Sequence, residues 1–397
     1  MHYRLGGARS VAVALLIAAR PASAEFFMGA DVSLLPFMQQ QNVAFKANGV
    51  AKPADTILYD AGANLFRVRL FVNPQTTYSN TNYGAVQSQS YAIALAQQLK
   101  SHAPGAKLLL DLHYSDTWAD PGQQTLPQAW AGQSLAQLRS TVQTYTADTL
   151  TAFKAAGVMP HMVQIGNETN GGMLWPVGAI NFNGTTAAQK TSWAAYGSLV
   201  RAAIAGVQQA QGTGTRPQIA LHIANGDNAG GPQYFFDKLG DPAYGNVDAA
   251  SFDTIGLSFY PNAAADMATL RTNMTDLASE YGKKLMVMET NAPWKSTSNA
   301  SDPAYADTPA GQLRFLTDLR TLVEGLPNDL GQGVMYWYPE AVQVAGYNIY
   351  NGGTTALFDT SGNALPALAA FAVPEPATLA VIATANLLLL RRRRVAD

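Results

Sequence analysis

The chain has 397 residues, of which 48% are hydrophobic and 13% are charged, and it carries a formal net charge of -2 at pH 7. This composition is typical of a globular protein with a large core, and it gives no electrostatic reason to expect nucleic acid or another polyanion as a partner. There is no cysteine, which excludes thiol catalysis and cysteine metal sites, although a core of this size needs no disulfide in any compartment.

The first 24 residues are predicted to be a secretory signal peptide. Arg4 and Arg9 precede an apolar run from Val11 to Ala19, and the small residues Ala22–Ala24 offer a cleavage site. The alternative is a frayed N-terminal helix. The signal peptide implies that the mature protein begins near residue 25.

Eight short apolar runs follow one another along residues 25–372. The runs are Phe27–Val32, Leu65–Phe71, Lys107–His113, His161–Gly166, Gln218–Ile223, Thr254–Tyr260, Lys284–Glu289 and Gly333–Trp337. Several are nearly continuous in apolar residues, as expected for strands buried on both faces of a parallel sheet. Between them, apolar residues recur at helical intervals over Ser90–Ser101, Leu135–Ala156, Thr191–Gln211, Ala264–Tyr281 and Ala310–Glu324. This alternation predicts an α/β fold, a single (β/α)8 TIM barrel, rather than an open sheet.

The C-terminal segment, residues 373–397, differs in composition from the rest. Val373–Pro376 is followed by an apolar run from Ala377 to Leu390 and by the basic cluster Arg391–Arg394. The run is shorter than the roughly 20 residues that usually span a membrane. The order of motif, apolar run and basic cluster resembles the PEP-CTERM sorting tail of Gram-negative bacteria. That resemblance implies export, processing of the tail by envelope sorting machinery, and delivery to the outer envelope or the exterior. A weak membrane anchor is the alternative.

Polar or aromatic groups end nearly every predicted strand, which is where a barrel of this kind holds its active site. They are Asp31, Arg69, Asp111 with His113, Asn167 with Glu168, His222, Tyr260, Glu289 and Trp337. Burying such groups costs stability unless they are hydrogen-bonded or paired. A barrel that served only as a scaffold would have no reason to keep them, so the sequence predicts a site at this end.

Glu168 and Glu289 are the candidate catalytic pair. They end the fourth and seventh predicted strands, which face each other across a barrel mouth. Hydrolysis of a glycosidic bond needs one carboxyl group that protonates the leaving oxygen and another that attacks or stabilises the anomeric carbon. Asn167, beside Glu168, is a candidate partner for the sugar 2-hydroxyl. The alternative for either glutamate alone is a salt-bridged structural carboxylate.

Arg69 and Tyr260 are expected to assist Glu289. A charge-assisted bond from Arg69 would keep Glu289 ionised, and Tyr260 would donate a hydrogen bond to it. His113 and His222 are either members of the site or satisfied core histidines. The five histidines form no H-E-x-x-H motif or dense cluster with carboxylates, so no catalytic metal is expected.

Five of the six tryptophans fall at or beyond predicted strand ends. They are Trp118, Trp130, Trp175, Trp294 and Trp337. Exposed aromatic faces suit the apolar faces of pyranose rings, so these side chains are expected to line sugar subsites. The alternative for any one of them is the packing of a loop.

Several segments of the chain resemble glycoside hydrolase family 53, the endo-β-1,4-galactanases of clan A. The segments are Gly29–Ser33, Arg67–Pro74, Leu110–Gly122, Gln164–Glu168, Leu174–Pro176, Gly256–Pro261, Met288–Asn291 and Gly333–Trp337. Together they span nearly all of residues 25–372, and the stretch from His113 to Pro121 is the most specific. Asp31, Asp111 and Asp116 lie in these segments and are counted among the supporting residues.

The resemblance implies a retaining double displacement with Glu168 as acid/base and Glu289 as nucleophile. It also implies β-1,4-galactan, the backbone of type I arabinogalactan, as the polysaccharide substrate. Two departures, Phe71 in place of the family's usual Trp and the loop Tyr338–Glu340 after Trp337, loosen the substrate assignment more than the chemistry. We expect a monomer that requires no cofactor.

Some bacterial relatives hold a structural calcium ion in the late loops, where Asp302 and Asp307 lie in this chain. Calcium takes six to eight oxygen ligands, so two carboxylates do not support such a site.

Two other functions stay open. A different clan A β-glycanase, such as a mannanase, would share the two glutamates but not the subsites. A catalytically silent sugar-binding protein of the envelope would be expected to lack one glutamate, and both are present.

Overall fold

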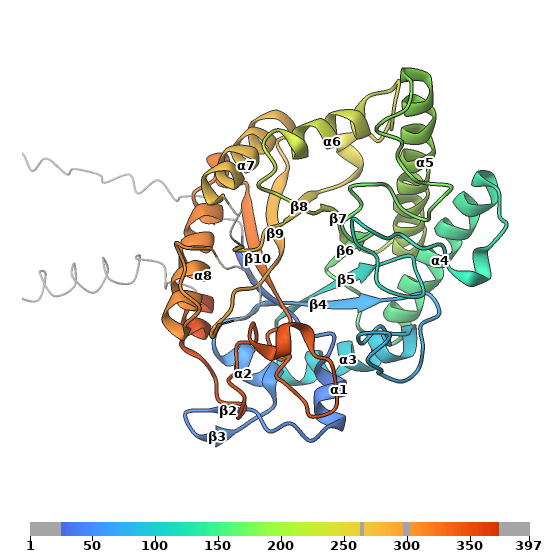
Figure 1. Ribbon diagram of the computed structural model, residues 1–397. Helices are drawn as coiled ribbons and strands as arrows, with labels where there is room; N and C mark the ends of the chain where they lie inside the picture. Colours follow the sequence, from blue (N-terminus) through green and yellow to red (C-terminus); the bar gives the residue numbers. More distant parts are fainter. Residues whose placement is uncertain (1–24, 263–265, 297–301, 373–397) are drawn as a thin grey trace, which may run out of the picture.

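The computed structural model describes residues 25–262, 266–296 and 302–372, so the predicted signal peptide and sorting tail lie outside the described residues. Eight parallel strands close into a barrel in the order β1-β10-β9-β8-β7-β6-β5-β4 (Figure 1). The strands are β1 (Phe27–Asp31), β4 (Leu65–Leu70), β5 (Lys107–Leu112), β6 (Met162–Ile165), β7 (Gln218–Ile223), β8 (Thr254–Ser258), β9 (Lys284–Thr290) and β10 (Gly331–Trp337). The predicted (β/α)8 barrel is confirmed.

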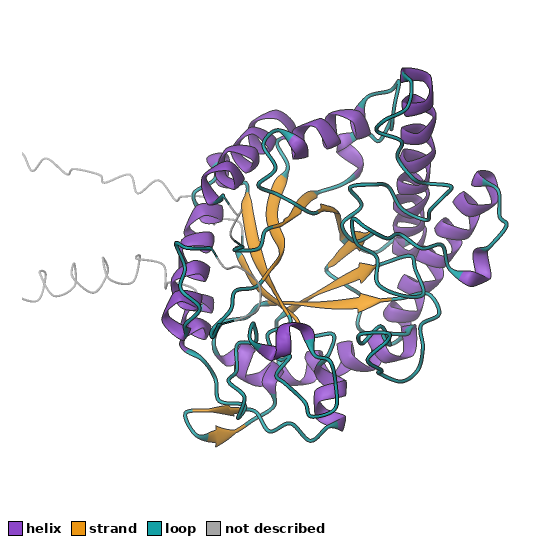
Figure 2. Ribbon diagram, in the orientation of Figure 1, coloured by secondary structure: helices purple, strands orange, loops and turns teal. Residues whose placement is uncertain are grey.

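Helices cover the outside of the barrel (Figure 2). They are α1 (Leu35–Gln40), α2 (Ala54–Asp60), α3 (Gln89–His102), α4 (Leu135–Ala155), α5 (Thr186–Gln211), α6 (Gly231–Gly240), α7 (Met267–Tyr281) and α8 (Pro309–Glu324). Short 3-10 turns are η1 (Gln128–Trp130), η2 (Ala249–Ser251), η3 (Pro327–Asp329), η4 (Tyr350–Gly353) and η5 (Pro366–Phe371). A small antiparallel pair, β2 (Lys46–Ala47) and β3 (Val50–Ala51), lies in the connection between β1 and α2.

Local capping groups explain where the long helices begin. Ser134 and Gln137 form a capping box at the start of α4, and the Thr185 side chain accepts a hydrogen bond from the first turn of α5. Asp266 caps α7 in the same way. The predicted helix from Thr191 therefore starts five residues earlier, at Thr186, where the Thr185 side chain accepts the Ala188 backbone N–H.

The barrel interior has an apolar layer below the mouth. It consists of Phe27, Leu65, Leu109, Met162, Ala220, Met286, Met288 and Met335, all buried. Gly29 makes room for this layer, because a Cβ atom there would lie 2.5 Å from the Met335 side chain. The layer fills the barrel and forms the floor below the polar residues further along the strands.

Among the described residues, no helix has the length and apolar character needed to cross a membrane.

Candidate active site

The alternation of side chains along the strands sends a set of polar groups into the barrel mouth. Leu65 of β4 belongs to the interior apolar layer, so Arg67 and Arg69, two and four residues on, also point inward. By the same spacing Leu109 is followed by Asp111, and Ala220 by His222. The apolar floor and the polar mouth are thus consecutive layers of one interior.

The two glutamates depart from this regular alternation. Met286 and Met288 both belong to the interior layer, which would turn Glu289 outward in a regular strand. A register shift between β8 and β9 pairs Leu257 with Val287 and then Ser258 with Glu289, so a bulge re-aims Glu289 toward the mouth. Glu168 lies just past β6 with a φ of 46°, in the left-handed region that non-glycine residues rarely occupy.

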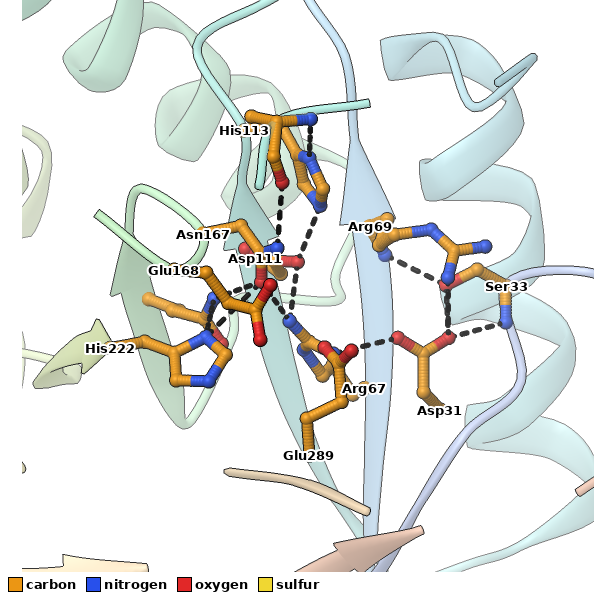
Figure 3. Close-up of polar contacts among 12 residues, drawn as sticks. Asp31, Ser33, Arg67, Arg69, Asp111, His113, Asn167, Glu168, His222 and Glu289 are labelled. Atoms are coloured by element: carbon orange, nitrogen blue, oxygen red, sulfur yellow. Dashed lines mark hydrogen bonds and ion pairs between the residues drawn. The ribbon is translucent and has the colours of Figure 1, made fainter. Parts of the chain in front are cut away.

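Arg67 is the centre of the buried charge cluster (Figure 3). Its Nη1 lies 2.8 Å from Glu289 Oε2 and 3.2 Å from Asp31 Oδ2. Its Nη2 donates to Asp111 Oδ2 at 2.8 Å and to Asn167 Oδ1 at 2.7 Å. Burial alone would lower the pKa of this guanidinium, but the surrounding carboxylates raise it above its ordinary value. Arg67 therefore stays charged and holds Glu289 beside a fixed cation.

Arg69 does not contact Glu289, so the prediction that it holds this carboxylate is wrong. Its guanidinium lies between the rings of Trp118 and Tyr338, at 4.4 and 4.6 Å from their centroids. Its Nη2 also donates to the Tyr338 hydroxyl at 2.7 Å. The reason is geometric: Arg67 is one inward step deeper in β4 and reaches Glu289, whereas Arg69 ends among the aromatic side chains of the mouth.

A hydrogen-bonded chain leads from Glu168 into the barrel. The Ser258 hydroxyl donates to Glu168 Oε1 at 2.5 Å, and His222 Nε2 lies 2.8 Å from Ser258 Oγ. His222 Nδ1 lies 3.1 Å from Gln164 Nε2. Burial and the nearby Arg67 charge lower the pKa of His222 well below its ordinary value, so the imidazole is neutral. The Ser258 hydroxyl donates its hydrogen bond to Glu168. Its oxygen therefore accepts a hydrogen bond from His222 Nε2.

The two glutamates lie in different environments. Burial, and then the charge of Glu289, raise the pKa of Glu168 to about 8, against the opposing effects of the Ser258 hydrogen bond and Arg67. Tyr260 donates to Glu289 Oε1 at 2.6 Å, as predicted. Burial and the Glu289 charge raise the pKa of Tyr260 well above its ordinary value, so this hydroxyl keeps its proton. At neutral pH a protonated Glu168 thus lies near a Glu289 held by a cation and a hydroxyl donor.

Both glutamates line one cavity of about 480 Å³ at the barrel mouth, here called the catalytic cavity. Eight predicted site residues line it: Arg69, His113, Trp118, Asn167, Glu168, Tyr260, Glu289 and Trp337. Its wall also includes Asp120, Gln123, Tyr78, Tyr83, Tyr338 and the segment 348–351. Most of the lining is aromatic or polar, which suits the two faces of a sugar chain.

Three other predicted residues, Asp31, Asp111 and His222, lie behind the cavity wall. Asp31 and Asp111 are fully buried against Arg67. His222 is also fully buried, and its Nε2 lies beside Ser258 Oγ. It is therefore both a hydrogen-bonded core histidine and a supporting member of the site. His113 Nδ1 accepts from the Ala119 backbone N–H, and its Nε2 lies 2.9 Å from Asp111 Oδ2. Asp111 therefore lies between the Arg67 guanidinium and the His113 ring.

The remaining predicted residues do not line the catalytic cavity. Asp116 accepts hydrogen bonds from the backbone N–H groups of Asn73 and Gln128 and joins two loops. The Trp175 indole donates to the Gly171 carbonyl, and the Trp294 indole donates to the Gly353 carbonyl. Trp130 is buried against Tyr145, at 5.4 Å between ring centroids. Trp130 therefore packs a loop, whereas the half-buried rings of Trp175 and Trp294 lie outside the lining of the catalytic cavity.

Sequence reasoning missed several residues that the structure brings into the site. Arg67 and Ser258 both lie in the quoted segments, and the inward alternation of their strands could have singled them out. Tyr338 lies in the loop that departs from the family pattern, and its ring stacks on Trp337 at 4.1 Å between centroids. Phe71, the other departure, is buried behind His113 at 4.8 Å and does not line the cavity.

The described residues contain no group of three His, Asp or Glu side chains that could hold a metal ion. Asp302 Oδ1 accepts the backbone N–H of Ala304, an ordinary turn interaction. Three carboxylates of the mouth, those of Asp31, Asp111 and Glu289, are already paired with Arg67.

Comparison with known proteins agrees with this geometry. The chain matches the family described as Glycosyl hydrolase family 53 over residues 27–371. A probable arabinogalactan endo-β-1,4-galactanase A of Aspergillus terreus is 37% identical over 332 residues, covering 81% of this chain and 87% of that protein. Among solved structures, one of two fungal β-1,4-galactanases is 30% identical with a TM-score of 0.75, covering 88% of this chain and 99% of that chain. The family 53 catalytic domain of Ignisphaera aggregans is 29% identical with a TM-score of 0.74, covering 89% and 97%. This chain belongs to glycosyl hydrolase family 53.

Proposed function

We propose that this protein is an endo-acting, retaining glycoside hydrolase that cleaves β-1,4-galactosidic bonds in galactan and type I arabinogalactan. Glu168 is the acid/base and Glu289 the nucleophile. The observation that carries the proposal is the contrast between them in one cavity, a carboxyl group with a pKa raised to about 8 and a carboxylate held by Arg67. The relatives named above support galactan as the substrate.

In the first step, Glu289 attacks the anomeric carbon while Glu168 gives its proton to the leaving oxygen. Ser258 donates to Oε1 of Glu168, so the acid proton is left for Oε2. Arg67 and Tyr260 both bind Glu289, at Oε2 and Oε1, and orient it for attack. The products are a glycosyl ester on Glu289 and a free sugar hydroxyl.

In the second step, Glu168, now a carboxylate, takes a proton from water while the water oxygen attacks the anomeric carbon. The bond to Glu289 breaks, and Arg67 and Tyr260 stabilise the carboxylate that leaves. Two inversions at the same carbon return the β configuration. Asn167, whose amide Nδ2 donates to the Ala119 carbonyl, is held at the cavity wall beside Glu168, where a sugar 2-hydroxyl would approach.

The test is release of reducing ends by the purified protein from linear β-1,4-galactan, with mannan, xylan and cellulose as parallel substrates. We expect rapid release of short galacto-oligosaccharides from galactan alone, with the newly formed ends in the β configuration by proton NMR at early times. Activity on another glycan would keep the chemistry but overturn the substrate, and α ends would overturn the retaining mechanism. Silence on all four would favour a sugar-binding protein.

We also propose that the enzyme works as a monomer outside the inner membrane of a Gram-negative bacterium. Residues 1–24 and 373–397, whose sequence supports this proposal, lie outside the described residues. The test is fractionation of a host that has the sorting machinery, expressing the full chain or chains without either segment. Loss of residues 1–24 should leave the enzyme in the cytoplasm, and loss of 373–397 should abolish its processing and envelope delivery. An unchanged distribution would contradict the proposal.

A further inference from the structure

Gln164 is a fully buried polar side chain of β6, and it does not line the catalytic cavity. Met162 of the same strand belongs to the interior apolar layer, so Gln164, two residues on, also points into the barrel. Its Nε2 lies 3.0 Å from the Gly166 carbonyl oxygen and 3.1 Å from Asn167 Oδ1. It also lies 3.1 Å from His222 Nδ1. The Gln164 amide therefore contacts the buried hydrogen-bonded chain of the site at its inner end.

The orientation of this amide follows from its neighbours. The Gly166 carbonyl oxygen can only accept hydrogen bonds, and Asn167 Oδ1 already accepts one from Arg67 Nη2 at 2.7 Å. If the Gln164 amide were turned over, its oxygen would face both acceptors with no hydrogen between them. The orientation leaves Gln164 Oε1 without a hydrogen-bond partner among the described residues, so the side chain is held by its donor group. Gln164 Nε2 therefore also faces His222 Nδ1 as a donor.

His222 has a single ring hydrogen, because its imidazole is neutral, and either ring nitrogen can carry it. Nδ1 could carry the hydrogen and donate to Asn167 Oδ1, which lies 3.1 Å away (Figure 3). Asn167 Oδ1 is already bound by Arg67 and Gln164, which occupy both of its lone pairs. A hydrogen on Nδ1 would also face the NH2 group of Gln164, donor against donor. Nδ1 is therefore the acceptor, and Nε2 carries the hydrogen.

The tautomer of His222 determines which oxygen of Glu168 carries the acid proton. With its hydrogen on Nε2, His222 donates to Ser258 Oγ at 2.8 Å, and the Ser258 hydroxyl donates to Glu168 Oε1 at 2.5 Å. Oε1 is then an acceptor, so a protonated Glu168 carries its hydrogen on Oε2. With the hydrogen on Nδ1, the Ser258 hydroxyl would donate to His222, and Glu168 would turn a hydrogen on Oε1 toward Ser258. A proton held in that direction is not available to the leaving oxygen.

We propose that Gln164 is a positioning residue for the acid/base step. Its NH2 group fixes the tautomer of His222 and, through Ser258, keeps the proton of Glu168 on Oε2. This inference rests on the proposed function, in which Glu168 protonates the leaving oxygen. The reacting atoms lie in the catalytic cavity, which Gln164 does not line, so it acts only through its neighbours. Loss of this amide should therefore impair proton donation without displacing either catalytic glutamate.

The first measurement is nitrogen-15 NMR of the histidine rings, with the His222 signals identified by their loss in His222→Gln. Wild type should show the Nε2–H tautomer of His222. Gln164→Met keeps the length of the side chain but has no donor group. In that variant about half or more of the molecules should carry the hydrogen on Nδ1, because Asn167 Oδ1 is the partner that remains. An Nδ1–H tautomer in wild type, or an unchanged tautomer in Gln164→Met, would overturn the inference.

The second measurement compares galactan, whose leaving oxygen must be protonated, with a dinitrophenyl galactoside, whose leaving group needs little protonation. In Gln164→Met, kcat on galactan should fall about tenfold, because part of the general-acid contribution is lost, while the pre-steady-state burst on the aryl substrate changes less than about twofold. Gln332→Met is the matched control, because it removes another buried strand amide, which contacts Thr254 and Gln218 away from the catalytic cavity. It should leave the His222 tautomer and the ratio of the two activities unchanged. An equal loss on both substrates in Gln164→Met would assign Gln164 a general structural role instead.

Failure of the proposed function would give a different result. If Glu168→Ala lost equal activity on both substrates, Glu168 would not be the acid, and the role of Gln164 would be refuted with it. If Glu168→Ala spared the aryl substrate as expected while Gln164→Met behaved like wild type, the role of Gln164 would be refuted alone. If wild type cleaved another glycan in place of galactan, the same comparison would be made with that glycan and its aryl glycoside, since Gln164 acts on the acid proton and not on the sugar.

Discussion

Charge balance at single residues explains why Glu168 keeps its proton to a higher pH than an ordinary glutamate. Arg67 is bound by three carboxylates, from Asp31, Asp111 and Glu289, so its charge is already shared. Glu168 has a serine hydroxyl as its partner and feels the Glu289 charge, in a buried position. A carboxyl group in that setting keeps its proton to higher pH. The two glutamates thus differ through their neighbours, not through their own chemistry.

Replacing Glu289 with Gly should abolish turnover, with a loss in kcat of roughly 10⁴-fold or more. A small anion such as azide fits the space that the carboxylate leaves and should restore bond cleavage on an aryl galactoside. Because only one displacement then occurs, the product should be the α-glycosyl azide, detected by NMR. A folded variant that no anion rescues would count against the nucleophile assignment.

Replacing Glu168 with Ala should affect substrates according to their leaving groups. A general acid contributes about 10² to 10⁴-fold where the leaving oxygen must be protonated. Galactan should lose activity in that range, whereas formation of the glycosyl-enzyme from a dinitrophenyl galactoside should be nearly unchanged in a pre-steady-state burst. Equal losses on both substrates would contradict the assignment.

Replacing Ser258 with Ala tests the raised pKa of Glu168 directly. Its hydrogen bond favours the charged form of Glu168 and therefore lowers the pKa. In Ser258→Ala this effect is lost, so the pKa of Glu168 should rise above about 8 and the basic limb of kcat/KM should move to higher pH. We expect a shift of about half a unit to one unit. Ser198→Ala, at a buried serine of α5 that donates to the Ala195 carbonyl, should leave the limb unmoved. A limb that moves to lower pH would refute this account.

The sequence predicted the strands and the long helices, but not the bulge in β9 or the short helices. All eight strands begin within two residues of their predicted positions, because strands buried on both faces read as apolar runs. The bulge beside Glu289 leaves no sequence signal, since Met286, Met288 and Glu289 read as an ordinary strand end. α1, α2 and α6 were not predicted, and with 6, 7 and 10 residues they are too short for a clear 3.6-residue periodicity.

The candidate site was likewise predicted only in part from the sequence. Strand ends predicted both glutamates, Asn167 and Tyr260 in the catalytic cavity, because parallel strands bring their carboxyl ends together. Alternation along β4 identifies both Arg67 and Arg69 as inward-pointing, but it does not show which of the two reaches Glu289. Loop contacts such as that of Trp175 with Gly171 depend on tertiary packing.

The loop after β10 is joined to α1 by a buried carboxyl group. Glu340 Oε1 accepts the Leu34 backbone N–H at 3.0 Å, one residue before α1. Burial and the nearby Asp31 charge raise the pKa of Glu340 to about 8, although its own backbone N–H, Arg69 and the Leu34 N–H oppose the rise. Because the folded pKa lies above that of the unfolded chain, this group favours folding at low pH, and that contribution is lost as the pH rises toward 8.

Glu340→Gln should therefore flatten the pH dependence of stability. Glutamine keeps an oxygen for the Leu34 N–H and cannot ionise. Between pH 5 and pH 8, the free energy of unfolding of wild type should fall by on the order of 3 kcal/mol more than that of the variant. Guanidinium unfolding at both pH values measures this difference. Parallel pH curves for the two proteins would rule out an ionisation penalty at Glu340.

At the scale of the whole molecule, η5 closes the ring of helices at the seam of the barrel. β1 is the first strand of the barrel and pairs with β10, the last, so the first and last helices of the ring lie on either side of that pair. η5 packs on α8, where Arg320 Nη1 donates to the carbonyls of Ala370 and Ala372. Its other side meets Gly62, just past α2, where a Cβ atom would lie 2.3 Å from the Phe371 carbonyl oxygen.

Removing η5 should therefore destabilise the barrel as a whole. Phe371 and Ala367 are fully buried and Leu368 nearly so, and burial of these side chains contributes roughly 3–5 kcal/mol. A chain that stops after Leu365 should lose about that much unfolding free energy, in a transition that stays cooperative because α2, α8 and the β1–β10 pair share this seam. A chain that stops after Ala372 keeps every one of these contacts and should unfold at the same guanidinium concentration as the full chain. Equal stability of the two truncated chains would mean that β1–β10 pairing closes the barrel without η5.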